Sequence, residues 1–269
     1  MQITSELVHV RAGSGEPVVL IHGIGHRKEA WEPIFERLAE SHDVIALDLA
    51  GFGSSAPYPR GTHYDMDNAC AHLAANFERW GLQRPHVVGN SLGGGIALEL
   101  AARGLVSSAT ALSPAGFFGR VDRFQALVPL LFMWLTSHVP DAALKAIARS
   151  GLGRRMIGFM LYAHPERASA EATYRDARAL RDGAGFLPTL RSGVRYSFTA
   201  QPQVPVTVAW GTGDRLLPYR QASTARQRLP QATHIALHDA GHVPMLDVPD
   251  RICELVEETI IRGREEGAA

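Results

Sequence analysis

The chain has 269 residues, 46% of them apolar, and its 27 basic residues balance 27 acidic ones. This length provides a sizeable core in one large or two small domains, and the balanced charge argues against a nucleic-acid or anionic-membrane partner. The two cysteines, Cys70 and Cys253, have neither framework nor metal-site spacing, so we expect reduced thiols. The sequence begins without a leader pattern, and its longest apolar stretch, residues 126–135, is too short for a membrane span. We therefore expect a cytoplasmic protein without stable membrane association.

Strand and helix patterns alternate in the first part of the chain. We expect an edge strand at residues 3–10 and buried strands, marked by continuous apolar runs, at residues 18–21, 44–47, 86–89 and 106–112. The helical patterns between them lie at about residues 31–39, 65–80 and 92–104. Alternation at this spacing is typical of a mostly parallel sheet with helices on both faces, which is an α/β fold.

The alternation stops between residues 114 and 200, where helical patterns occur without a convincing strand. These patterns cover residues 124–135, 142–150, 154–162 and 168–181. Strands resume at residues 204–210 and 233–237, with helices at about residues 219–229 and 249–262. We therefore predict an α/β core domain, residues 1–113 and 201–269, interrupted by an inserted helical cap, residues 114–200.

A serine between two glycines follows one of the buried strands. Gly89-Asn90-Ser91-Leu92-Gly93 has the Gly-x-Ser-x-Gly pattern between a strand and a helix, which is the context of a nucleophile elbow. The glycines permit a tight turn, and the helix N-terminus after Ser91 favours negative charge. A glycine-rich turn with an incidental serine has the same local pattern. Residues elsewhere in the chain therefore have to distinguish a catalytic serine from an incidental one.

A serine hydroxyl is activated by a base within hydrogen-bond reach, and that base needs an orienting acid. Around an elbow the expected order along the chain is serine, acid, histidine. Asp214 follows the strand at residues 204–210, and His242 follows the strand at residues 233–237. Both therefore belong at the carboxyl edge that also carries Ser91, where the active sites of open α/β sheets lie. We predict a catalytic triad of Ser91, Asp214 and His242.

Other acids and histidines fit these roles less well. Asp239 and Asp247 flank His242 too closely in sequence to orient it from a separate loop. His22 is as well explained by a structural hydrogen bond as by catalysis, and His26 could overhang the site.

The tetrahedral oxyanion needs two backbone donors aimed at one point. One is the N–H of Leu92, directly after the nucleophile. The other is expected from the loop after the strand at residues 18–21, where Gly23 and Gly25 let the backbone turn inward. Ile24 is the best candidate in this loop, although the same residues could form only a tight strand-to-helix turn.

Together these segments resemble an α/β-hydrolase fold protein with a helical cap. The matching pieces are His22-Gly23-Ile24-Gly25, Asp48-Leu49-Ala50-Gly51-Phe52-Gly53-Ser54-Ser55, Gly89-Asn90-Ser91-Leu92-Gly93-Gly94, Gly211-Thr212-Gly213-Asp214 and Gly241-His242-Val243-Pro244. They are spread over nearly the whole chain except the predicted cap, and they are far more specific for the fold than for a substrate. In similar proteins the Asp48 segment shapes a loop near the sheet edge, so the resemblance implies no catalytic role for Asp48.

The resemblance also reduces the number of reactions that this chain is expected to catalyse. Haloalkane dehalogenases and epoxide hydrolases are similar but place an aspartate at the elbow, so Ser91 argues against both. Hydrolases that cleave carbon–carbon bonds in aromatic ring-fission products often share the Gly-Asn-Ser elbow. They commonly have a tryptophan after the catalytic histidine, where this chain has Val243. Some relatives with a full triad are ligand-sensing proteins, so three functions stay open: an ester hydrolase, a carbon–carbon hydrolase and a sensor.

Aromatic and apolar residues of the predicted cap suggest a pocket wall over Ser91. The candidate substrate-binding residues are Phe118, Phe132, Trp134, Met160 and Val243. We expect a serine esterase that cleaves a small-to-medium apolar ester or lactone through an acyl-enzyme, with no metal or cofactor. Its expected partner is a small-molecule substrate, and the protein is expected to be a monomer or homodimer.

Overall fold

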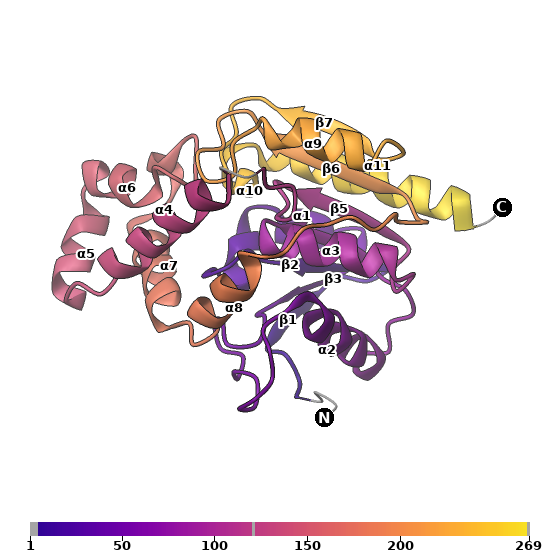
Figure 1. The fold of residues 1–269 in the computed structure, drawn as a ribbon, viewed down its shortest axis with the longest axis horizontal. Helices are drawn as coiled ribbons and strands as arrows, with labels where there is room; N and C mark the ends of the chain where they lie inside the picture. Colours follow the sequence, from indigo (N-terminus) through magenta and orange to yellow (C-terminus); the bar gives the residue numbers. More distant parts are fainter. Residues whose placement is uncertain (1–4, 120–121, 268–269) are drawn as a thin grey trace.

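A computed structural model describes residues 5–119 and 122–267, in which seven strands form one sheet (Figure 1). The strands are β1 (His9–Ala12), β2 (Glu16–Ile21), β3 (His42–Leu47), β4 (His86–Asn90), β5 (Ser108–Leu112), β6 (Val206–Gly211) and β7 (Thr233–Leu237). Their order is β1-β3-β2-β4-β5-β6-β7, and β1 alone runs antiparallel to its neighbour. The predicted mostly parallel α/β sheet is therefore confirmed.

Apolar layers cover both faces of the sheet, because successive residues of a strand point to opposite sides. The core helices are α1 (Glu32–Ala39), α2 (Met66–Arg79), α3 (Leu92–Ala102), α9 (Gln221–Arg228), α10 (Pro244–Asp247) and α11 (Pro249–Gly267), with a short 3-10 helix at Lys28–Trp31. In β2, Val19 and Ile21 belong to the apolar cluster that includes α2, α3 and α9. Val18 and Leu20 belong to the cluster that includes α1 and α11. The parallel strands therefore end together at one edge, with helices packed on either side.

A block of helices stands between β5 and β6. It consists of α4 (Asp122–Thr136), α5 (Asp141–Arg149), α6 (Gly151–Gly158), α7 (Ala170–Asp182) and α8 (Phe186–Gly193), with a 3-10 turn at Pro165–Arg167. Figure 1 shows these helices gathered at one side of the sheet. We call this block the cap. The sequence pattern did not predict α8, because Gly183, Gly185 and Pro188 weaken it; burial of Phe186 and Leu190 accompanies the helix instead.

The first strand is shorter than predicted. β1 starts at His9, whereas the predicted strand starts at residue 3, which lies outside the described residues. The Leu7 N–H donates to the Asn76 side chain at 2.9 Å, and the Val8 N–H donates to the Ser55 hydroxyl at 2.9 Å. Because side chains satisfy these donors, the segment before His9 does not extend the ladder.

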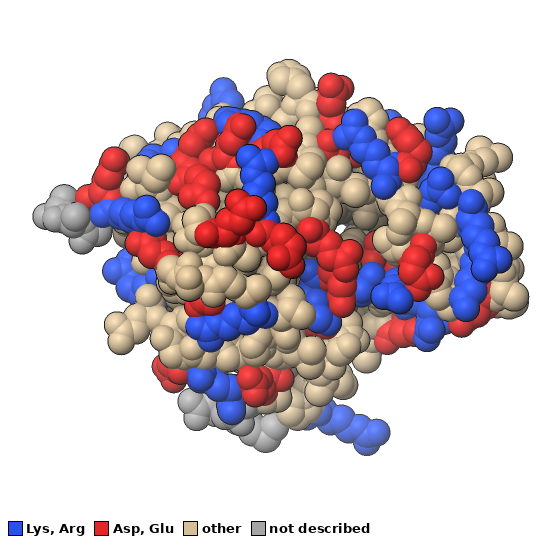
Figure 2. Space-filling view, turned by 180° about the vertical axis from the view of Figure 1, so that it is seen from behind, with Lys and Arg blue, Asp and Glu red and all other residues tan. Residues whose placement is uncertain are grey.

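The surface carries charges of both signs, interspersed over the face shown in Figure 2. Among the helices of residues 5–119 and 122–267, none by itself is long and apolar enough to cross a membrane. The pair α4 and α5, bent by 112°, meets the same length and composition test only when the two are taken together.

Candidate active site

Ser91 lies in the sharp turn between β4 and α3. Its backbone has φ 57° and ψ −115°, a conformation that residues other than glycine rarely adopt. A Cβ on Gly89 would lie 2.0 Å from the carbonyl oxygen of Gly93, and a Cβ on Gly93 would lie 2.0 Å from that of Ile21. Only glycine fits at these two positions, so the Gly-x-Ser-x-Gly pattern has a steric cause in this turn.

The loop after β2 lies directly against the serine. A Cβ added to Gly23 would approach the Ser91 Cβ to 3.1 Å. Leu92 is the first residue of α3, where a backbone N–H has no partner within the helix. Ile24 and Leu92, the predicted oxyanion-hole residues, line one cavity together with Ser91. They therefore approach the serine from two separate segments, as a pair of oxyanion donors must.

Asp214 and His242 are hydrogen-bonded across the loops that follow β6 and β7. The Nδ1 of His242 donates to Oδ2 of Asp214 at 2.8 Å, and both side chains are buried. The other carboxylate oxygen accepts the N–H groups of Leu216 at 2.9 Å and Leu217 at 2.8 Å. A carboxylate only accepts, so Nδ1 carries the proton, and in the neutral imidazole Nε2 is free to accept one. That is the tautomer a general base requires.

Asn90 connects the elbow to the histidine loop. Its Nδ2 donates to the carbonyl of His242 at 2.8 Å and to that of Leu112 at 3.1 Å. No role for Asn90 is predicted from the sequence, although its place inside the elbow motif is a signal. Within the described part of the chain no hydrogen bond joins the Ser91 hydroxyl to His242; such bonds often tighten only around a substrate. Ser91 and His242 nevertheless line one common cavity.

Asp247, which the sequence analysis set aside as an orienting acid, binds the histidine loop to the cap. Its buried carboxylate accepts the N–H of Gly241 at 2.8 Å. It also accepts the N–H groups of Ala163 and His164, each at 2.9 Å. One carboxylate therefore fixes both the turn that carries His242 and a cap segment that is 83 to 84 residues away in sequence.

The same cap segment has two further links to the core. The Val243 N–H donates to the Leu161 carbonyl at 2.9 Å. Arg215, next to Asp214, donates to the carbonyls of Phe159 at 2.8 Å and Tyr162 at 3.2 Å. We call the contacts of Asp247, Val243 and Arg215 with residues 159–164 the clasp. The clasp joins the cap to both loops that carry the predicted acid and base.

Replacing Asp247 by alanine is expected to lower the free energy of unfolding by about 3 kcal/mol. Three N–H groups, one buried and two part-buried, lose their acceptor. Urea unfolding measures this change. The matched control is Asp250→Ala, since the exposed Asp250 pairs with Arg37 at the surface and its loss should cost less than about 0.5 kcal/mol. Equal unfolding free energies for the two variants would contradict the role given to Asp247.

An apolar cavity of about 640 Å³ lies between the core and the cap, and Ser91 and His242 both line it. We call it the large cavity; its volume is typical of small-molecule sites. Three of the predicted substrate-binding residues, Phe132, Met160 and Val243, line it as well. Phe132 is 65% exposed, which places it at the cavity mouth. An apolar ligand could therefore enter along an apolar rim and reach the serine.

The other two predicted substrate-binding residues lie elsewhere. Phe118 lines a second cavity of about 80 Å³, the small cavity, which also reaches Ser91. Trp134 lines neither cavity: its indole stacks on Phe186 of α8 with ring centroids 6.1 Å apart. Its position on α4 turns it toward α8, while the neighbouring Met133 faces the large cavity. Trp134 thus packs the cap internally, contrary to the prediction.

His26 and Asp48, two residues considered from the sequence, have defined contacts. His26 lines the large cavity, with Nε2 4.0 Å from Oδ2 of Asp176. Asp48 is fully buried and accepts the backbone N–H groups of Lys28 at 2.7 Å and Ser54 at 2.9 Å. Asp48 therefore holds two loops together at the sheet edge.

His22 supports the loop that carries Ile24. Its Nε2 accepts the Leu49 N–H at 3.0 Å, which leaves the proton on Nδ1 to be donated to the Gly23 carbonyl at 2.7 Å. Burial lowers the pKa of His22 from 6.5 to about 4, although the charge of Asp48 opposes this shift. His22 is therefore neutral near pH 7, where it positions backbone atoms.

The lowered pKa of His22 makes the fold sensitive to acid. The unfolded chain binds the proton more readily, so this contribution is complete above pH 6.5 and is lost as the pH falls toward about 4. The full loss corresponds to about 3 kcal/mol. Urea unfolding near neutral pH and near pH 5 should show this decline in the wild type and a smaller one in His22→Gln. An unchanged pH dependence in that variant would assign the acid sensitivity to other groups.

The family model described as the alpha/beta hydrolase fold matches residues 16–249. The chain belongs to the α/β hydrolase fold family. An uncharacterized protein of Mycobacterium tuberculosis is 30% identical over 263 residues, which cover 91% of this chain and 75% of that protein. Lipase 1 of Psychrobacter immobilis is 28% identical over 264 residues, which cover 93% of this chain and 78% of that protein.

Solved structures agree with this membership. A meta-cleavage product hydrolase from Pseudomonas fluorescens IP01 superposes with a TM-score of 0.74 at 22% identity, covering 94% of this chain and 93% of that chain. At this identity the likeness shows the α/β hydrolase fold alone. The residues that act within the fold have to be argued from the geometry of this chain.

Proposed function

We propose that this α/β hydrolase is a serine esterase that cleaves small-to-medium apolar esters or lactones. One observation carries the proposal: the hydrogen-bonded pair of Asp214 and His242 opens onto the same apolar cavity as Ser91. The relative named Lipase 1 supports ester chemistry in the family. The apolar lining and the volume of the large cavity support an apolar substrate.

In the proposed mechanism, His242 Nε2 takes the proton of the Ser91 hydroxyl as Ser91 Oγ attacks the ester carbonyl. Asp214 holds the imidazole tautomer and stabilises the imidazolium. The N–H groups of Ile24 and Leu92 stabilise the tetrahedral oxyanion, a contribution of roughly 3–4 kcal/mol per donor. His242 then gives the proton to the leaving alcohol. Water hydrolyses the acyl-enzyme by the same sequence of proton transfers and frees Ser91.

A fluorophosphonate probe tests the proposed nucleophile directly. Ser91 Oγ should displace fluoride from the probe, and peptide mass spectrometry of the labelled protein should locate the phosphonyl group on Ser91. The same preparation should turn over p-nitrophenyl acetate many times per enzyme molecule. Folded protein that neither reacts with the probe nor turns over the ester would favour a ligand-sensing role on the same fold.

The alternative function, a carbon–carbon hydrolase, is tested by incubating the same preparation with a ring-fission dienoate. The Gly89-Asn90-Ser91 elbow supports this alternative, because hydrolases of ring-fission products often share it. Val243 weakens it, since this position lines the large cavity without a tryptophan ring. Loss of the visible absorbance of the dienoate, with no turnover of any ester, would replace the esterase proposal.

A further inference from the structure

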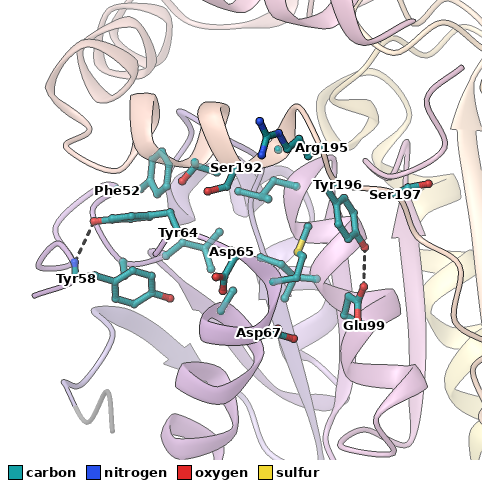
Figure 3. Close-up of a pocket in the computed structure, with 18 of the residues that line it drawn as sticks. Phe52, Tyr58, Tyr64, Asp65, Asp67, Glu99, Ser192, Arg195, Tyr196 and Ser197 are labelled. Atoms are coloured by element: carbon teal, nitrogen blue, oxygen red, sulfur yellow. Dashed lines mark hydrogen bonds between the residues drawn. The ribbon is translucent and has the colours of Figure 1, made fainter. Parts of the chain in front are cut away.

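A separate pocket of about 430 Å³ lies between α2, α3 and α8. Tyr58 and Tyr64 lie on one side of it and Tyr196 on the other, with Ser192 and Arg195 from the α8 region between them (Figure 3). We call it the tyrosine pocket. Its lining also includes exposed charged residues, so it opens toward solvent. No step of the mechanism above uses it.

The tyrosine pocket and the small cavity share part of their walls. Five residues line both: Met66, Leu92, Thr189, Gly193 and Tyr196. The small cavity in turn reaches Ser91. The small cavity therefore adjoins both the serine and the tyrosine pocket. The five shared residues form the boundary between the small cavity and the tyrosine pocket, and we call this boundary the constriction. The Tyr196 hydroxyl donates to Glu99 at 3.1 Å, which fixes this ring in the constriction (Figure 3).

The two cavities at Ser91 differ in the catalytic groups that they contain. Of these two cavities, His242 lines only the large one and Leu92 lines only the small one. Ser91 and Ile24 line both. The leaving group has to receive its proton from His242. It therefore belongs in the large cavity. The acyl group is bonded to the same carbonyl carbon on the opposite side and is directed toward the small cavity.

We propose that the acyl chain of the substrate runs from Ser91 through the small cavity into the tyrosine pocket, which makes medium-chain acyl groups the preferred class. This assignment rests on the proposed esterase function. The small cavity, at about 80 Å³, holds only a short chain, since ligand sites are usually several times larger. Longer chains have to pass Met66 and Gly193 and end beside the tyrosines.

Gly193 offers a way to close this route without disturbing the fold. It is the last residue of α8, and a Cβ added there meets no atom within 4 Å. Gly193→Trp should fill the constriction, and Gly193→Leu should fill it partly. The matched control is Gly151→Trp, because Gly151 is an exposed cap residue whose added Cβ also meets nothing within 4 Å.

The readout is the ratio of kcat/KM for p-nitrophenyl octanoate to that for p-nitrophenyl acetate. We expect Gly193→Trp to lower this ratio at least ~10-fold, Gly193→Leu to lower it less, and Gly151→Trp to keep the wild-type ratio. If Gly193→Trp does not fold, the proposal is tested by the ratio in Gly193→Leu, which should also be lower than in the wild type. A wild-type ratio in every folded Gly193 variant would overturn the proposal.

A second series separates the two ends of the substrate. Alkyl butanoates with alcohols of increasing length are compared by the rate of acid release. If Gly193→Trp discriminates among the alcohols and not among the acyl chains, the acyl assignment is overturned. The esterase proposal itself is tested by ester turnover and by labelling of Ser91 in the wild type. Failure of the acyl-chain assignment can therefore be distinguished from failure of the esterase proposal.

Discussion

Replacing Ser91 by alanine is expected to lower kcat for ester hydrolysis by about 10⁵- to 10⁶-fold, with the fold intact. The substitution removes the only atom that attacks the carbonyl in the proposed mechanism. The N–H groups of Ile24 and Leu92 stay in place, so a small residual rate above the uncatalysed reaction should persist. The hydroxyl makes no hydrogen bond among the described residues, so its loss should cost little stability. In kinetics with p-nitrophenyl acetate the burst should disappear, and the steady rate should fall to this residual level.

The matched control for this variant is Ser223→Ala. Ser223 is exposed on α9, where its hydroxyl donates to a carbonyl one turn earlier. Its replacement should leave kcat at the wild-type level. If Ser91→Ala retained more than about a hundredth of wild-type activity, another group would have to be the nucleophile.

Asp214→Asn is expected to lower kcat by about 10⁴-fold. Both N–H groups of Leu216 and Leu217 point at one carboxylate oxygen, so the amide oxygen of asparagine will occupy that place. Its NH₂ group must then face His242 and donate to Nδ1. That bond stabilises the tautomer with the proton on Nε2, which cannot accept the serine proton. The loss of kcat is measured by steady-state hydrolysis of p-nitrophenyl acetate.

Asp239→Asn is the control for Asp214→Asn. Asp239 is exposed and has φ 55°, a left-handed conformation that asparagine tolerates well. Its replacement should preserve kcat. A loss of activity in Asp239→Asn as large as in Asp214→Asn would make Asp239 the orienting acid instead.

The parts of the fold and site that could be predicted are those with a local cause. The buried strands were readable because both faces of a parallel sheet demand continuous apolar runs, as in β2 and β4. Ser91, Asp214 and His242 could be proposed together because each follows a predicted strand. Parallel strands bring their carboxyl ends to one edge, so chain order was enough to predict that the three residues lie near one another.

The rest depends on contacts between distant segments. Asn90 meets the carbonyl of a residue 152 positions away, and Asp247 meets cap residues more than 80 positions away. The residues next to Asn90 and Asp247 in sequence do not indicate which distant segments these two side chains contact. Trp134 was misassigned because periodicity identifies the apolar sides of a helix but not which neighbour covers them. The tyrosine pocket was missed for the same reason, since its walls come from three separate helices.

The clasp has a consequence for how this protein can change over evolutionary time. On the cap side it uses mainly backbone atoms: the N–H groups of Ala163 and His164 and the carbonyls of Phe159, Leu161 and Tyr162. Backbone atoms survive almost any substitution that preserves the local conformation. The side chains that line the large cavity can therefore diversify while the attachment persists. New specificities can arise in the cap without a new way of holding Asp214 and His242.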